Sequence, residues 1–319
     1  MHQDTNMRLT VVIPIFRVEA FIERCARSLM EQTLDNVEYI FVDDCSPDGS
    51  INILRHVLKE YPQRNVKIIR HNINRGLPAA RNTGLAHATG KYIFHCDSDD
   101  YIECDALERM YKKAIETDAD IVYSDWYLTF PLKERYMSCP AYTRPKKALQ
   151  ALLHGTMKYN VWNKLVRRSL YVDHNISFPE GHGMGEDMTM ILLFAQARSV
   201  TYLPYPTYHY VRQNENAYTA INSEASHEDL LYNANYVIKT LTGHIPEKDI
   251  ACFKLNVKYP LLISDKLEDY DRWLQWFPEA NKYISFHQVS ARAQLLEKCA
   301  KIRFFLPLRI HYHLLSLFL

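Results

Sequence analysis

The sequence predicts an α/β protein in which a largely parallel sheet, built from about the first 125 residues, precedes a mainly helical C-terminal region. Between residues 9 and 125, short apolar runs alternate with segments of helical periodicity, as in successive βα units. Beyond residue 225 the helical spacing continues, and Pro246, Pro260 and Pro278 mark the expected breaks. A hydrophobic content of 47% and a charged content of 24% are typical of a folded globular protein.

The expected strands are five apolar runs, at residues 9–15, 37–42, 66–69, 92–96 and 120–123. Between the first two, apolar residues from Val18 to Leu29 follow the i, i+3, i+4, i+7 spacing of a helix with one buried face. Residues 51–58 and 106–115 show the same spacing. This half therefore has the pattern of a nucleotide-binding fold.

From about residue 143 the pattern loosens. We expect a helix at 147–154, a glycine-rich turn at 181–185, a helix at 187–197 and strands at 200–203 and 208–211. The resulting division is one domain over residues 1–220, with halves at about 8–125 and 126–220, and a helical region over 221–319.

Charge and cysteine content narrow the class of protein. The net charge of +1, from 38 basic and 37 acidic residues, argues against nucleic acid as a partner. Seven cysteines without a Cys-x-x-Cys pair indicate reduced thiols, and no apolar stretch precedes the first strand, so we expect no secretory signal and a cytoplasmic protein.

The C-terminal end is apolar and basic. Residues 302–319 are interrupted by Arg303, Pro307 and Arg309, which makes a membrane span a poor interpretation. Residues 291–319 carry five basic residues against the single acidic Glu297, a balance that suits an anionic lipid surface. A terminal helix docked on the core or on a second subunit explains the same pattern.

Polar residues follow three of the expected strands, where ligands of open α/β sheets bind. Asp43-Asp44 ends the second strand, Arg75 to Gly84 follows the third, and Asp97-Ser98-Asp99 ends the fourth. Carboxylates spaced i, i+2 suit Mg²⁺ or Mn²⁺, with a diphosphate completing the coordination. For an isolated Asp-x-Asp, a solvated acidic turn is the simpler explanation.

Four stretches in this order, residues 10–16, 41–49, 75–84 and 92–100, resemble the family 2 glycosyltransferases, bacterial enzymes with the Rossmann-like GT-A domain. The resemblance implies the following roles: Pro14 and Phe16 flank the nucleoside, Asp44 hydrogen-bonds uracil, Arg81 lies beside the base or diphosphate, Asp97 contacts ribose or metal, and Asp99 is the principal metal ligand. Residues 8–125 would then be the nucleotide half and 126–220 the acceptor half.

A second matching motif is Gly185-Glu186-Asp187, which resembles the family's Glu-Asp pair at a helix start. The resemblance makes Asp187 the catalytic base, with Glu186 holding the acceptor or orienting Asp187. A carboxylate suits this task because a single displacement needs a proton acceptor at the attacking hydroxyl. An acidic first helical turn, favourable to the helix dipole, is the alternative.

Two further segments resemble family stretches on the acceptor side. Trp162 and Lys164 would line an acceptor-sugar subsite, because sugar C–H faces pack on aromatic rings. His209 or Arg212 would reach the diphosphate or the acceptor. A core tryptophan and a strand of alternating exposure are the alternatives.

The resemblance implies an inverting, metal-dependent transferase that uses Mn²⁺ or Mg²⁺. It would move a sugar from a nucleotide-diphosphate donor, expected to be UDP-linked, to a surface glycan or lipid-linked saccharide, with the C-terminus at the inner membrane surface. A dinucleotide-dependent oxidoreductase is excluded because residues 11–18 contain no glycine. An aspartate-nucleophile phosphatase and a non-catalytic sugar-binding protein of the same fold remain as alternatives.

Overall fold

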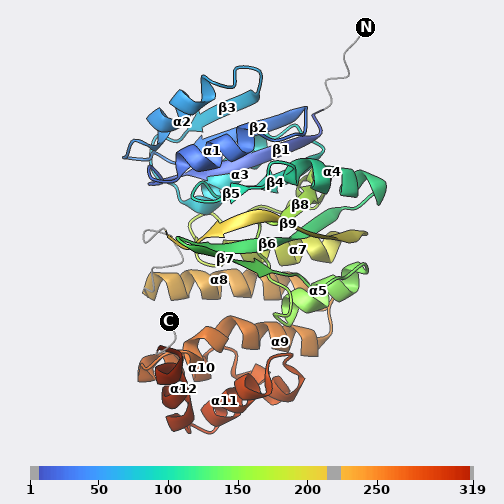
Figure 1. The fold of residues 1–319 in the computed structure, drawn as a ribbon. Coiled ribbons are helices and arrows are strands. Elements are labelled where there is room, and N and C mark those ends of the chain that lie inside the picture. The colour runs from blue at the N-terminus through green and yellow to red at the C-terminus, as the bar shows by residue number, and fades with distance from the viewer. Residues whose placement is uncertain (1–6, 214–223, 317–319) are drawn as a thin grey trace. The chain divides into compact units, whose positions relative to one another are not determined.

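The computed structural model describes residues 7–213 and 224–316 (Figure 1). They form two compact units, one from residues up to 145 together with 159–233, and one from residues 146–158 together with those from 234 onward. The domain boundary expected after residue 220 lies outside the described residues.

The first unit contains a nine-stranded sheet of order β3-β2-β1-β4-β8-β6-β9-β5, with β7 paired to β6. The strands are β1 (Leu9–Ile15), β2 (Val37–Asp43), β3 (Asn65–Arg70), β4 (Tyr92–His95), β5 (Tyr101–Ile102), β6 (Ile121–Phe130), β7 (Lys133–Met137), β8 (Lys164–Arg167) and β9 (Val200–Val211). Its helices are α1 (Ile22–Met30), α2 (Ser50–Leu58), α3 (Leu77–His87), α4 (Ala106–Glu116), α6 (Arg168–Asp173), the 3-10 turn η1 (Glu186–Met188) and α7 (Thr189–Gln196).

The four strands β1 to β4 are parallel, as the sequence predicts, and every residue of β1 and β2 is buried. The fifth predicted strand, β6, joins them through β8, which is antiparallel to both β4 and β6. The sheet is therefore mixed, and the expected α/β class is confirmed. The two strands expected between residues 200 and 211 are one strand, β9, which crosses a register shift against β6 at Asp125.

The sheet register places the predicted rim at one edge. Ile15 of β1 pairs with Asp43 of β2, and the Cys96 N–H after β4 donates to the Val12 carbonyl. Helix α3 packs directly on β1, because a Cβ on Gly84 would lie 2.3 Å from Cγ1 of Val12. This close approach brings the side chains of α3 to the carboxyl ends of β2 and β4.

The second unit is helical. Its elements are α5 (Pro145–Leu153), the residues of α8 (Glu224–Leu241) from 234 onward, α9 (Glu247–Lys258), η3 (Tyr259–Leu262), α10 (Leu267–Gln275), η4 (Pro278–Phe286), α11 (Ala291–Lys301) and α12 (Leu306–Ser316). Lys258 is buried in its core, where Nζ donates to the Trp276 carbonyl at 2.8 Å and to Asn281 Oδ1 at 2.6 Å. Burial lowers the pKa of Lys258 to about 7. Among the described residues, no helix combines the length and the apolar character that a membrane crossing requires.

Candidate active site

Asp44 fixes the entrance to α3. Its Oδ1 accepts hydrogen bonds from the Arg75 N–H at 2.8 Å and from Nδ1 of His71 at 2.7 Å, and its Oδ2 accepts from the Gly76 N–H at 2.7 Å. Gly76 has a φ of 86°, in the region that favours glycine. The carboxylate predicted to meet uracil therefore also orders the loop that leads into α3.

Arg81 on α3 joins the two acidic motifs. Its Nη2 donates to Asp97 Oδ1 at 2.9 Å and lies 3.6 Å from Oε1 of Glu186, and the side chain is 1% exposed. Its Nε and Nη1 have no hydrogen-bond partner among the described residues. Buried N–H groups without partners are rare and costly, and here they belong to a cation that lies between two acidic motifs.

The end of β4 is tied to β9 through Asp100 and Tyr208. The Asp97 N–H donates to the Tyr208 hydroxyl at 3.0 Å, which donates to Oδ2 of Asp100 at 2.8 Å, while Oδ1 accepts from the Val211 N–H at 2.7 Å. Burial, with the charges of Asp99 and Asp97, raises the pKa of Asp100 well above its ordinary value. Sequence reasoning gave neither Asp100 nor Tyr208 a role.

The Glu-Asp motif is a 3-10 turn, η1, ahead of α7 rather than the first turn of the expected helix. Gly185 precedes it in the left-handed conformation, with φ 86° and ψ 14°. Burial is the main cause that raises the pKa of Glu186 and of Asp187, and the nearby Arg81 opposes both shifts. A carboxylate with a raised pKa can take up a proton near neutral pH, as a general base must.

The loop before this motif rests on α3. Asn82 donates to the Phe178 carbonyl at 2.9 Å and accepts from the Phe178 N–H at 2.8 Å, and Arg75 pairs with Glu180 at 2.9 Å. The guanidinium of Arg81 also lies 5.6 Å from the centre of the Phe178 ring. Helix α3 thus orders the approach to Glu186 as well as the rim.

Of the predicted nucleoside contacts, Pro14 is buried within β1, whereas the Phe16 side chain is 39% exposed beyond its end. The guanidinium of Arg17 lies 5.2 Å from the Phe16 ring centre. Phe16 therefore presents an accessible ring at the same sheet edge as Asp44.

The predicted acceptor residues are only partly brought together. Trp162 is buried, with its ring stacked on Tyr208 at 4.5 Å. Lys164 is buried, its Nζ donates to the Asn160 carbonyl at 2.6 Å, and burial lowers its pKa to about 8, opposed by the charge of Asp187 among others.

The other two predicted acceptor residues, His209 and Arg212, lie on β9 and just beyond its end. Strand alternation turns His209 to the face opposite Tyr208, where its ring nitrogens bond to Glu103 at 2.9 Å and Glu134 at 2.8 Å. The structure does not bring His209 to Asp97 or Asp187. Arg212 is exposed just beyond the end of β9.

The side chains of residues 7–213 and 224–316 do not by themselves complete a metal site. In the part of the chain that the structure describes, no group of three or more His, Cys, Asp or Glu side chains is arranged to hold an ion. Asp97 and Asp99 are both partly buried. Their hard oxygens fit a divalent cation whose remaining ligands come from phosphate and water.

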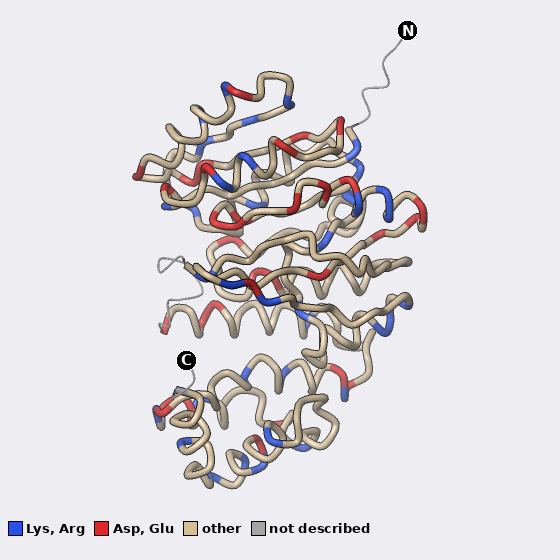
Figure 2. The backbone as a smooth tube through the Cα atoms, in the orientation of Figure 1, with Lys and Arg blue, Asp and Glu red and all other residues tan. Residues whose placement is uncertain are grey.

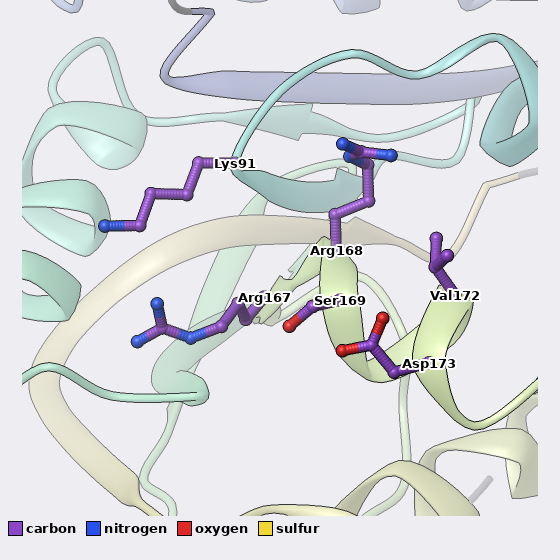
Figure 3. A pocket seen from close by; sticks show the side chains of 6 residues that line it. All are labelled: Lys91, Arg167, Arg168, Ser169, Val172 and Asp173. Atoms are coloured by element: carbon purple, nitrogen blue, oxygen red, sulfur yellow. The ribbon is translucent and has the colours of Figure 1, made fainter.

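One hollow of the first unit lies at the other end of β4 (Figure 3). It has a volume of about 300 Å³ and is lined by Lys91, Arg167, Arg168, Ser169, Val172 and Asp173. In Figure 3 the basic side chains of Lys91 and Arg168 point in different directions, and Arg167 is paired with Asp118 and Asp120. We therefore do not assign the donor site to this hollow.

Comparison with known proteins identifies the family of this chain. The family model described as glycosyl transferase family 2 matches residues 10–174. The putative glycosyltransferase EpsH of Bacillus subtilis is 30% identical over 84% of this chain and 73% of its own length. The uncharacterized glycosyltransferase EpsJ of the same organism is 33% identical over a region that covers 67% of this chain and 63% of that relative.

Among solved structures, S. aureus TarS residues 1–349 in complex with UDP-GlcNAc superpose with a TM-score of 0.74 at 20% identity, covering 96% of this chain and 91% of that one. This likeness shows the GT-A fold. Since these relatives are glycosyltransferases, the phosphatase and non-catalytic alternatives are set aside. The chain belongs to glycosyl transferase family 2 and is a glycosyltransferase.

Proposed function

We propose that the protein is an inverting, metal-dependent glycosyltransferase that moves a sugar from a UDP-linked donor to a hydroxyl of a surface glycan or lipid-linked saccharide. The observation that carries this proposal is the position of Arg81, within 3.6 Å of acidic side chains from both motifs. A donor diphosphate at Arg81 would have its sugar close to the Glu186–Asp187 turn.

The donor rests on the rim. Phe16 offers a ring face to the nucleoside, and Asp44 has a carboxylate that accepts from the uracil imide N–H. The positive charge of Arg81, held next to Asp97 and Glu186, stabilises the charge that develops on the diphosphate as it leaves. Mn²⁺ or Mg²⁺, bound by Asp99 with support from Asp97, would supply further charge neutralisation at the phosphates.

Asp187 acts as the base. It accepts the proton of the acceptor hydroxyl as the oxygen attacks the anomeric carbon from the face opposite the diphosphate, which inverts the configuration. Glu186, buried beside Arg81, orients Asp187. On the acceptor side, Lys164 lies in the electrostatic field of Asp187, Trp162 supports the site floor through Tyr208, and Arg212 remains a candidate contact.

We also propose that the protein works in the cytoplasm as a peripheral protein on the inner membrane face. The segment of residues 291–315, which holds α11, most of α12 and the link between them, has exposed apolar side chains at Leu295, Ile302, Phe304, Leu306, Ile310 and Leu314. Apart from Glu297, the acidic and basic residues of this segment are Lys and Arg (Figure 2), and Glu297 is fully buried against His287 at 2.8 Å. A surface of this kind suits an anionic lipid headgroup layer.

Sedimentation with vesicles tests the membrane proposal. Protein should sediment with phosphatidylglycerol-containing vesicles and not with pure phosphatidylcholine, and deletion of Phe304 to Leu319 should abolish this. Two results would assign this surface to protein packing instead. One is aggregation of the truncated protein. The other is a wild-type dimer that does not bind vesicles and that Ile310→Glu dissociates.

Thermal unfolding with a panel of nucleoside diphosphates tests the donor site. A ligand that binds only the native state raises the melting temperature of the protein by mass action. UDP with Mn²⁺ or Mg²⁺ should stabilise the protein, and chelator should remove the effect. An unchanged melting temperature with every nucleotide would contradict the proposal.

A further inference from the structure

The turn that carries Glu186 and Asp187 is fixed by side chains of α8. Asp229 accepts hydrogen bonds from Nδ1 of His182 at 3.1 Å and from the Gly183 N–H at 2.9 Å. Asn233, 2% exposed, donates from Nδ2 to the His182 carbonyl at 3.0 Å and to the Met184 carbonyl at 2.8 Å. One helix therefore holds both the N–H and the carbonyl groups of the backbone just before the motif.

Packing adds to these hydrogen bonds. A Cβ on Gly185 would lie 3.1 Å from Cδ1 of Leu230 and 3.7 Å from Cβ of Asn233, so α8 lies directly against the backbone that precedes Glu186. The His182 ring stacks on Tyr232 with centroids 3.5 Å apart. These contacts lie within the first unit, to which residues 224–233 of α8 belong.

The carboxylate of Glu186 is contacted by a different helix, α3. Arg81 of α3 lies 3.6 Å from it, whereas the hydrogen bonds described above join Asp229 and Asn233 to residues 182–184. These hydrogen bonds reach Asp187 through the backbone of the turn.

We propose that Asp229 and Asn233 are positioning residues of the transfer reaction, which act through residues 182–185 to hold Asp187 at the attacking hydroxyl. This role rests on the proposed function of Asp187. A displacement of about 1 Å in a reacting group can cost about 100-fold in rate. Because the donor-binding residues belong to other elements, loss of the α8 contacts should change turnover and leave donor binding intact.

The test uses the full chain with Mn²⁺ and a panel of UDP-glucose, UDP-galactose and UDP-N-acetylglucosamine, following UDP release with water as acceptor. Asn233→Ala removes both donated hydrogen bonds, and Asp229→Asn keeps the shape but weakens the acceptor. Asn235→Ala is the matched control, because Asn235 lies exposed on the same helix. We expect kcat to fall about 10- to 100-fold in Asn233→Ala, less in Asp229→Asn, and not in the control, with donor KM within about twofold throughout.

Amide exchange over residues 182–188 supplies a second readout. It should be faster in Asn233→Ala than in Asn235→Ala, while exchange in β1 and β2 stays unchanged. Equal kcat in Asn233→Ala and Asn235→Ala, or a raised donor KM with unchanged kcat, would contradict the positioning role alone. A wild-type protein that neither binds UDP nor releases it from any donor would contradict the proposed function, and the positioning role with it.

Discussion

Replacement of Gly185 by alanine probes the backbone on which the catalytic turn depends. Gly185 has a φ of 86°, and a non-glycine residue in the left-handed region costs about 1–2 kcal/mol. The new Cβ would also lie 3.1 Å from Cδ1 of Leu230 and 3.3 Å from Cε of Met188. Both atoms end flexible side chains and can shift, so we expect a total loss of about 2–3 kcal/mol in the free energy of unfolding.

Gly181→Ala is the matched control for this change. Gly181 has a φ of 83°, and among the described residues other than Gly181 and its two chain neighbours no heavy atom lies within 4 Å of the point that a Cβ would occupy, so the alanine there reports the conformational cost alone. Urea unfolding of both variants and the wild type gives the two costs, and UDP release gives the effect on turnover. A Gly185→Ala protein as stable as Gly181→Ala would refute the close packing of Leu230 and Asn233 on this turn.

Three further predictions concern buried charges. Burial raises the pKa of Glu186, so the folded protein keeps a proton that the unfolded chain loses above the ordinary pKa of 4.5. The free energy of unfolding should therefore fall as pH rises from 5 toward 8, and it should fall less in Glu186→Gln. Urea midpoints measured across this pH range for both proteins test this. Parallel curves would contradict this. Arg81→Met removes the two unpartnered N–H groups and a positive charge that lowers the pKa of Asp187. The UDP-dependent rise in melting temperature should therefore shrink, and the acid limb of the pH profile of residual turnover should move to higher pH. An unchanged response to UDP would count against a role for Arg81 in binding the nucleotide sugar. Burial lowers the pKa of Lys258 to about 7, so above pH 7 the unfolded chain binds more protons than the folded protein. The free energy of unfolding of the wild type should therefore rise toward pH 10, and denaturant titrations of Lys258→Met should lack this rise. An equal rise in both proteins would contradict the lowered pKa of Lys258.

The rim could be predicted because it depends on local pattern. Continuous apolar runs identified β1, β2 and β4, and parallel strands place their carboxyl ends at one edge, which brings Arg81 to Asp97 at 2.9 Å. The spacing from Val18 to Leu29 likewise identified the buried face of α1, where Cys25, Ala26 and Leu29 are fully buried.

The acceptor side was less predictable because it depends on pairing between distant segments. β8 is only four residues long, and its pairing with β4 and β6 is what makes it a strand. Its own sequence therefore carries little signal for secondary structure. The sequence predicts His209 or Arg212 at the diphosphate or the acceptor, with a strand of alternating exposure as the alternative. On β9, His209 and Tyr208 face opposite ways, as that alternative implies.

The α8 contacts carried no sequence signal at all. Asp229 and Asn233 lie more than 40 residues from the turn they hold, and their spacing on a helix is that of any two exposed polar residues. Tertiary structure alone shows that they meet the backbone of residues 182–184.

The most direct test of the account compares Asp187→Asn with the wild type under saturating UDP-linked donor and Mn²⁺. Loss of the base should lower turnover by about 100-fold or more while UDP still stabilises the variant as it does the wild type. Unchanged turnover in a correctly folded Asp187→Asn protein would contradict the assignment of Asp187 as the base.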